Sequence, residues 1–267
     1  MNIITLIENL VYKQGLVAEH GLSIYIETEN RKILFDTGQT GLFLQNAHKL
    51  GVAIENIDSL VLSHGHSDHT GGLYPFLEKN NKAKVFAKND IFTPKYHGPN
   101  RFIGTLRNER LLKNRLIYVN APTEIAENIF IMPDIPISDS TDTHFEGMYQ
   151  KNENKFVPDE FDDELFLALK ENDRTNIVTA CSHRGITNIC RTAIEHFTLP
   201  VGLIIGGFHM KNCSIEQYGY IMQYFNQIHP KSIGVCHCTG VEKYSEMIRD
   251  CESDLFYNFT GYEINIG

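Results

Sequence analysis

The sequence has no apolar run near the roughly 20 residues that cross a bilayer. Its first residues, Met1-Asn-Ile-Ile-Thr-Leu-Ile-Glu8, lack the basic start of a secretory signal and read as a strand. The six cysteines show no paired framework, which excludes a disulfide scaffold and predicts reduced thiols. A net charge of -9 leaves no positive excess for nucleic acid or an anionic membrane surface. We therefore expect a cytoplasmic protein with neither of those partners.

The chain has no tandem repeat and no low-complexity linker, and its 267 residues suffice for one sizeable core. We predict a single domain over 1–267 with a decorated, proline-interrupted insertion at about 88–160. Period-two patterns predict strands at 2–8, 22–27, 32–36, 59–63, 84–87, 116–119, 129–132, 176–180, 202–205, 232–236, 255–257 and 262–264. Helical patterns follow at 40–50, 70–79, 164–171, 186–196, 214–228 and 241–250. This order predicts an α/β (α+β) fold of two mixed sheets with helices on both outer faces.

The most informative stretch is His64-Gly-His66-Ser-Asp68-His69, which places four strong metal ligands within six residues. It follows an apolar strand and precedes a helix. His64 and His66 are two positions apart in an extended segment, so their side chains point to one side and can bind one ion. Asp68 and His69, on the turn into the helix, face a neighbouring position where a second ion could lie.

Three later strands also end in histidine. His183 follows the strand at 176–180, His209 follows a glycine pair after the next strand, and His237 follows the strand at 232–236. Ligand sites in α/β proteins lie outside the carboxyl ends of strands. The simplest partition gives one ion His64, His66 and His183, and the other ion Asp68, His69 and His237. Three protein ligands per ion leave room for water, as in catalytic sites, and two ions about 3.5–4 Å apart can share an activated hydroxide.

The motif His-x-His-x-Asp-His with later histidines at strand ends resembles the metallo-β-lactamase superfamily over essentially the whole chain. The resemblance implies a four-layer αββα sandwich with a dinuclear metal site. The finer pattern is similar to the dihydropterin–ribofuranosylaminobenzene phosphate synthase-like group, whose other members are metal-dependent hydrolases. It rests on Leu34-Phe-Asp-Thr-Gly38, Asp162-Asp-Glu164, Cys181-Ser-His-Arg-Gly-Ile-Thr-Asn188, Gly206-Gly-Phe-His209 and His237-Cys-Thr-Gly240.

One departure from the family pattern bears on the substrate. Many members have an aspartate that bridges the two ions after the penultimate strand, where this chain has Gly-Gly-Phe-His209. His209 would then bind one ion terminally or contact the substrate. Without the bridging carboxylate the site is more positive, which favours an anionic small molecule such as a phosphate ester. Zinc is the favoured metal, and iron, manganese and nickel also suit these ligands.

We therefore expect a metal-dependent hydrolase in which a metal-bound hydroxide attacks an ester, in the first place a phosphoester. Asp68, His209 and Arg184 are the candidate catalytic residues, the last two orienting the substrate or protonating its leaving group. The alternatives are a pterin-type transferase that displaces pyrophosphate, an iron oxidoreductase of the same fold, and a metal-binding sensing protein without turnover. The sequence leaves a homo-oligomer open.

Several other residues allow two interpretations. Asp36 either fixes the tautomer of a ligand imidazole or belongs to a turn. The acidic run at 159–164 either reaches the site or offsets a helix dipole. Cys236 and Cys238, flanking His237, are expected to be packed thiols that point away from it. Between 88 and 116 basic residues prevail, which indicates a solvated face or an anion-binding surface: Lys88, Lys95, Arg101, Arg107, Arg110, Lys113 and Arg115.

Overall fold

The structure is a computed structural model that describes residues 1–152, 155–171 and 173–266. It divides into two compact units. Unit 1 comprises Met1–Asn120, Glu146–Asp163 and Phe259–Gly267, and unit 2 comprises Ala121–Phe145 and Glu164–Asn258. The expectation of one domain with an insertion at about 88–160 stays a prediction.

Unit 1 is built on a seven-stranded mixed sheet in the order β18-β1-β2-β3-β4-β5-β8. Its strands are β18 (Glu263–Asn265), β1 (Asn2–Ile7), β2 (Ser23–Glu27), β3 (Lys32–Phe35), β4 (Ser59–Val61), β5 (Lys84–Ala87) and β8 (Leu116–Tyr118). The pairs from β18 to β3 are antiparallel, and those from β3 to β8 are parallel. The parallel strands β3 and β4 therefore end at the same edge of the sheet.

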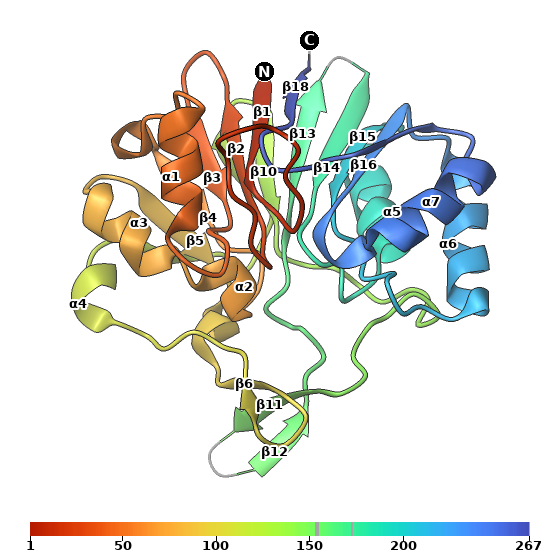
Figure 1. The fold of residues 1–267 in the computed structure, drawn as a ribbon. Coiled ribbons are helices and arrows are strands. Elements are labelled where there is room, and N and C mark those ends of the chain that lie inside the picture. Colours follow the sequence, from red (N-terminus) through yellow and green to blue (C-terminus); the bar gives the residue numbers. More distant parts are fainter. Residues whose placement is uncertain (153–154, 172, 267) are drawn as a thin grey trace. The chain divides into compact units, whose positions relative to one another are not determined.

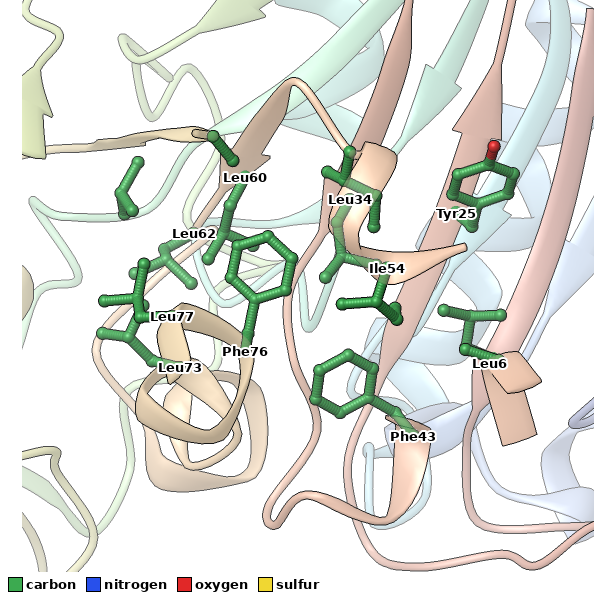
Figure 2. Packing of buried hydrophobic residues seen from close by; sticks show 14 of the residues in the cluster. Leu6, Tyr25, Leu34, Phe43, Ile54, Leu60, Leu62, Leu73, Phe76 and Leu77 are labelled. Atoms are coloured by element: carbon green, nitrogen blue, oxygen red, sulfur yellow. The ribbon is translucent and has the colours of Figure 1, made fainter. Parts of the chain in front are cut away.

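Helices α1 (Leu42–Lys49) and α3 (Leu73–Lys79) cover one face of this sheet (Figure 1). Their apolar side chains enter the core of unit 1, where Phe43 and Phe76 lie fully buried in one cluster with Leu34, Leu60 and Leu62 (Figure 2). The two short helices α2 (Ser67–Thr70) and α4 (Glu109–Leu112) and the single turns η1 (Ile54–Asn56) and η2 (Asn89–Phe92) connect these elements.

A small antiparallel sheet in the order β12-β11-β6-β7 also belongs to unit 1. Its strands are β6 (Lys95–His97), β7 (Arg101–Phe102), β11 (Met148–Asn152) and β12 (Lys155–Pro158). These four short strands bring together two segments that are some fifty residues apart in sequence, because Gln150 pairs with Lys95.

Unit 2 holds a second seven-stranded mixed sheet in the order β17-β16-β15-β14-β13-β10-β9. Its strands are β17 (Asp254–Tyr257), β16 (Ser232–Val235), β15 (Val201–Gly206), β14 (Arg174–Val178), β13 (Phe166–Glu171), β10 (Ile129–Met132) and β9 (Thr123–Ala126). The four strands from β14 to β17 are parallel. Helix α5 (Ile186–Phe197) packs on β14 and β15, α6 (Ile215–Ile228) packs on α5, and α7 (Val241–Asp250) packs on β17 (Figure 1).

The predicted α/β class with two large mixed sheets and flanking helices is confirmed. Among the described residues, no helix combines the length and apolar character needed to cross a bilayer. The helix predicted at 164–171 is wrong, because Phe166–Glu171 is strand β13 between β10 and β14. Phe166 to Leu169 are buried without alternation, and a short buried apolar run does not distinguish a strand from a helix. Strands β6, β7, β9, β11 and β12 were not predicted, because their short polar sequences carry a weak pattern.

Candidate metal centre

The predicted ligand segment of unit 1 lies where β4 ends. His64, His66 and His69 are buried there. The ring centroids of His64 and His66 are 4.7 Å apart, and those of His64 and His69 are 4.3 Å apart. Asp68 Oδ2 lies 3.7 Å from His69 Nε2. These four residues form what we call the histidine–aspartate cluster, and the structure brings them together as the spacing predicted.

Asp36 fixes the orientation of this cluster. It follows β3, the parallel neighbour of β4, and its buried carboxylate accepts hydrogen bonds from Ser63 N at 2.8 Å and Ser63 Oγ at 2.7 Å. His69 Nδ1 lies 2.8 Å from the same carboxylate. A carboxylate only accepts, so His69 carries its proton on Nδ1 and its lone pair on Nε2. The interpretation of Asp36 as the residue that fixes an imidazole tautomer fits this geometry.

His64 is oriented through the same carboxylate. Ser63 Oγ donates its one proton to Asp36, so at 2.9 Å it must accept from His64 Nδ1. The His64 lone pair is thus also on Nε2. Burial, followed by the neighbouring rings of His69 and His66, lowers the pKa of His64 well below its usual value. A neutral imidazole with one nitrogen fixed as donor is the form that binds a metal ion.

His20 contacts the histidine–aspartate cluster, which the sequence does not predict. Its Nε2 lies 3.2 Å from Asp68 Oδ2, although the His20 side chain is 60% exposed. It lies 48 positions before Asp68 in a loop without regular spacing, and no pattern in the sequence indicates this contact.

In unit 2, His183, His209 and His237 follow β14, β15 and β16 in turn. Because these strands are parallel neighbours, the three histidines gather at one edge of the sheet. One donor atom each from Cys181, His183 and His209 lie within 4.8 Å of one another, and so do those of Cys181, His237 and Cys238. We call these five residues the histidine–cysteine cluster.

The backbone around His183 is held by two groups in unit 2. His183 Nδ1 donates to the His144 carbonyl at 3.1 Å, which again leaves the ring lone pair on Nε2. The buried Glu164 carboxylate accepts from His183 N and Arg184 N, both at 2.7 Å. The acidic run thus contributes to the site region by binding main-chain amides, and it is followed by strand β13, so it does not start the helix expected there.

Replacing Glu164 by glutamine should lower the free energy of unfolding by about 2–3 kcal/mol, because one of two buried amides then faces an NH2 group. Urea unfolding of metal-free protein measures this loss. The control Glu246→Gln removes a carboxylate that pairs with Lys243 at 2.8 Å at the surface of the same unit, and we expect less than about 0.5 kcal/mol from it. Equal losses in the two variants would contradict the assigned role of Glu164.

Several residues at or beside the two clusters have a left-handed backbone. Asp36, Ser182, His209 and His237 have φ angles of 58°, 55°, 50° and 51°, in the left-handed region that costs non-glycine residues about 1–3 kcal/mol. The glycine pair before His209 allows close packing of the backbone. A Cβ on Gly207 would lie 2.5 Å from Cys238 Sγ and 2.7 Å from the Ala180 carbonyl oxygen.

The candidate substrate residues lie at this same edge of unit 2. The His209 ring centroid is 4.5 Å from that of His183 and 5.3 Å from that of His144. Arg184 Nε donates to the Ile135 carbonyl at 2.9 Å, which holds its guanidinium group. The position of His144 was not indicated by any ligand spacing in the sequence.

The expectation that Cys238 points away from His237 is wrong. His237–Thr239 form the single turn η3 instead of continuing β16, so the alternation of an extended strand does not apply. Burial acts to raise the pKa of Cys238, but hydrogen bonds with Cys181 and His209 and the nearby His237 outweigh it, and the pKa lies well below its usual value. Cys236 is fully buried, as expected of a packed thiol. All six cysteines lie in the described part of the chain and are free thiols.

Fold and clusters together define the class: an α/β protein with histidine-rich groups of potential metal ligands at the carboxyl ends of its strands. Residues 16–148 match the family model of the metallo-beta-lactamase superfamily. An uncharacterized protein of Methanocaldococcus jannaschii, MJ0448, is 32% identical over 246 residues, which cover 91% of this chain and 92% of that protein. The 7,8-dihydropterin-6-methyl-4-(beta-D-ribofuranosyl)-aminobenzene-5'-phosphate synthase of the same organism is 30% identical over 276 residues, which cover 96% of this chain and 93% of that protein.

Among solved structures, Tm1679, a metal-dependent hydrolase of the beta-lactamase superfamily, superposes with a TM-score of 0.88 at 27% identity, covering 100% of this chain and 99% of that one. The chain belongs to the metallo-β-lactamase superfamily and has its fold, so the resemblance read from the motifs is confirmed. This places it among the enzymes of that superfamily.

Proposed function

We propose that this protein is a metal-dependent hydrolase that cleaves phosphoester bonds in a small anionic molecule with two divalent cations. One ion would be held by His64, His66 and His183, and the other by Asp68, His69 and His237. Zinc is the favoured metal, with iron, manganese and nickel as alternatives. Bound cations would supply Lewis acidity and an activated water.

The observation that carries the proposal is the tautomer of three buried imidazoles. His64, His69 and His183 each have Nδ1 engaged by an acceptor, namely Ser63 Oγ, the Asp36 carboxylate and the His144 carbonyl. Each therefore offers a basic Nε2. Buried neutral imidazoles with such support suit a divalent transition metal better than calcium or magnesium, which prefer oxygen ligands.

The class of substrate follows from charge. Among the proposed ligands Asp68 is the one carboxylate, so two dications leave the site strongly positive. A phosphoester brings the compensating negative charge. His209 and Arg184, at the unit 2 edge, are proposed to orient the substrate or to pass a proton to its leaving group.

A second candidate is a transferase of the pterin type, in which pyrophosphate leaves as a new bond forms. The relationship to the Methanocaldococcus jannaschii synthase over nearly the full length of both chains favours it.

A substrate panel with defined metal content decides between these functions. Protein purified without added metal should contain close to two transition-metal ions per chain by mass spectrometry. Chelation should lower phosphoesterase activity by at least about a thousandfold, and the native metal should restore it, because the ions supply several kcal/mol of transition-state stabilisation.

Three outcomes would overturn the proposal in part or as a whole. Preference for neutral lactones or thioesters would reject the phosphoester substrate. Turnover that requires a co-substrate and releases pyrophosphate would favour the transferase. Absence of turnover with both metal positions filled would leave a metal-binding sensing protein.

A further inference from the structure

Lys95, at the start of β6, is a buried cation that the proposed function does not use. Its side chain is 1% exposed, and Nζ lies 2.7 Å from Asp159 Oδ2 and 2.9 Å from Asp163 Oδ1, two carboxylates that are themselves buried. Burial acts to lower the pKa of Lys95, but the two carboxylates raise it above its usual value. A buried ion triad is costly to desolvate and is weak evidence for a role in stability alone.

The triad is bonded to the peptide between two proposed metal ligands. Asp163 uses Oδ1 for Lys95, and its Oδ2 accepts a hydrogen bond from Gly65 N at 2.8 Å. Gly65 lies between His64 and His66. The orientation of this peptide determines how far apart the two imidazoles lie.

Gly65 is packed so closely that it has no room for a side chain. A Cβ there would lie 2.4 Å from the Ile91 carbonyl oxygen, 2.8 Å from Lys95 Cε and 3.1 Å from Asp163 Oδ2. On the side where a Cβ would lie, the triad and the turn at Ile91 therefore enclose the Gly65 backbone.

The same triad also contacts the two rings through Phe161. Asp159 Oδ1 accepts from Phe161 N at 3.0 Å, and Phe161 has a left-handed φ of 52°. The centroid of its buried ring is 5.4 Å from Lys95 Nζ, 6.0 Å from the ring centroid of His64 and 5.2 Å from that of His66.

A main-chain path from Lys95 reaches the next residue of the segment. Ile103 N donates to the Lys95 carbonyl at 2.9 Å, and the Ile103 carbonyl accepts from Ser67 N at 2.6 Å. The Asp163 side chain and the Ile103 main chain therefore both bind the backbone of residues 65–67.

We propose that Lys95 and Asp163 are positioning residues for the metal ligands. Through the Gly65 amide they fix the peptide between His64 and His66, and so set the geometry in which these two imidazoles hold one ion. The inference rests on the proposed function for the identity of the ligands. It adds that the buried triad of Lys95, Asp159 and Asp163 determines metal affinity.

Two isosteric variants separate positioning from stability. Asp163→Asn and Asp159→Asn each remove one ion pair with Lys95. In Asp163→Asn the amide oxygen is drawn to the Lys95 ammonium group, so the NH2 group faces Gly65 N–H, donor against donor. In Asp159→Asn the amide oxygen is likewise drawn to the Lys95 ammonium group and the NH2 group faces Phe161 N–H, while the bond from Gly65 N to Asp163 is untouched.

The experiment measures the Kd of the whole metal-stripped protein for Zn²⁺ and Co²⁺ by chelator competition, with the Co²⁺ absorption spectrum as a reporter of ligand geometry. Asp163→Asn should weaken binding of the ion held by His64 and His66 about 10–100-fold and shift the Co²⁺ bands, as loss of groups supporting metal ligands does. Asp159→Asn should stay within about threefold of the wild type, because no ligand backbone is released. Both should lose similar stability in urea.

If Asp163→Asn does not fold, the variant Lys95→Met/Asp159→Asn/Asp163→Leu removes all three charges, a type of replacement that proteins tolerate. It lacks the Gly65 acceptor and should show the same weakening. Wild-type affinity and spectrum in either folded variant would overturn the inference. Failure of the proposed function is recognised separately in the wild type. If the wild type binds both ions but does not cleave phosphoesters, the proposed function fails and the positioning role stands; if it binds neither ion, both fail.

Discussion

Replacing His64 by alanine is expected to lower kcat/KM for phosphoester cleavage by at least about a thousandfold, a loss of about 4 kcal/mol of transition-state stabilisation. The proposed ion would keep two protein ligands of three, which is fewer than catalytic zinc sites use. We also expect the metal content of the purified variant to fall. Steady-state kinetics and elemental analysis of the same preparation check both results.

A matched control removes an imidazole elsewhere in unit 1. His48 lies on helix α1, is exposed, and should tolerate alanine with unchanged metal content and rate. Because His64 is fully buried, its loss also leaves a cavity, so near-UV circular dichroism of metal-free protein must show that the variant is folded. A folded His64→Ala protein with full activity and two ions would remove His64 from the site.

How much of the fold the sequence predicts depends on how clearly each segment shows its period. Amphipathic helices such as Ile186–Phe197 and the parallel strands were placed within a few residues. Phe166–Glu171 was assigned to the wrong class, because its buried run Phe166-Leu-Ala-Leu169 carries no alternation and strand pairing on both sides decides its conformation. Among the short strands that the sequence does not predict, β6 and β11 pair with each other across some fifty positions, a contact that no local pattern indicates.

The candidate site divides in the same way. Local spacing predicts that His64, His66, Asp68 and His69 meet, and parallel strands predict that His183, His209 and His237 share an edge. Contacts between distant segments escape such reasoning. The sequence groups Lys95 with the basic residues of a surface. In the structure it is buried with Asp159 and Asp163, which lie 64 and 68 positions away. His20 and His144 are absent from the predicted site for the same reason.

The Asp36→Asn variant should weaken metal binding about 100-fold or more, the upper end of what loss of one such partner costs, because two imidazoles depend on this carboxylate. The oxygen of the introduced amide can still accept from Ser63 N. Its NH2 group then replaces Oδ2, the acceptor of both Ser63 Oγ and His69 Nδ1. Asparagine also tolerates the left-handed φ of 58° at this position, so backbone strain does not confound the result.

The consequence is a change of tautomer at two rings. His69 must present a bare Nδ1 to the new donor and carry its proton on Nε2, where the metal should bind. Ser63 Oγ, now accepting from the introduced NH2 group, turns its proton toward His64 Nδ1, so that ring is protonated at Nε2 as well. Nitrogen-15 NMR of the imidazoles measures the tautomers, and chelator competition measures the metal affinity.

The control Asp58→Asn changes a carboxylate of unit 1 that binds Lys32 N and Lys82 Nζ, both at 3.0 Å, and touches no imidazole in the described structure. If both variants bind metal as the wild type does, Asp36 has no influence on the proposed ligands, and the tautomer argument for the metal centre fails.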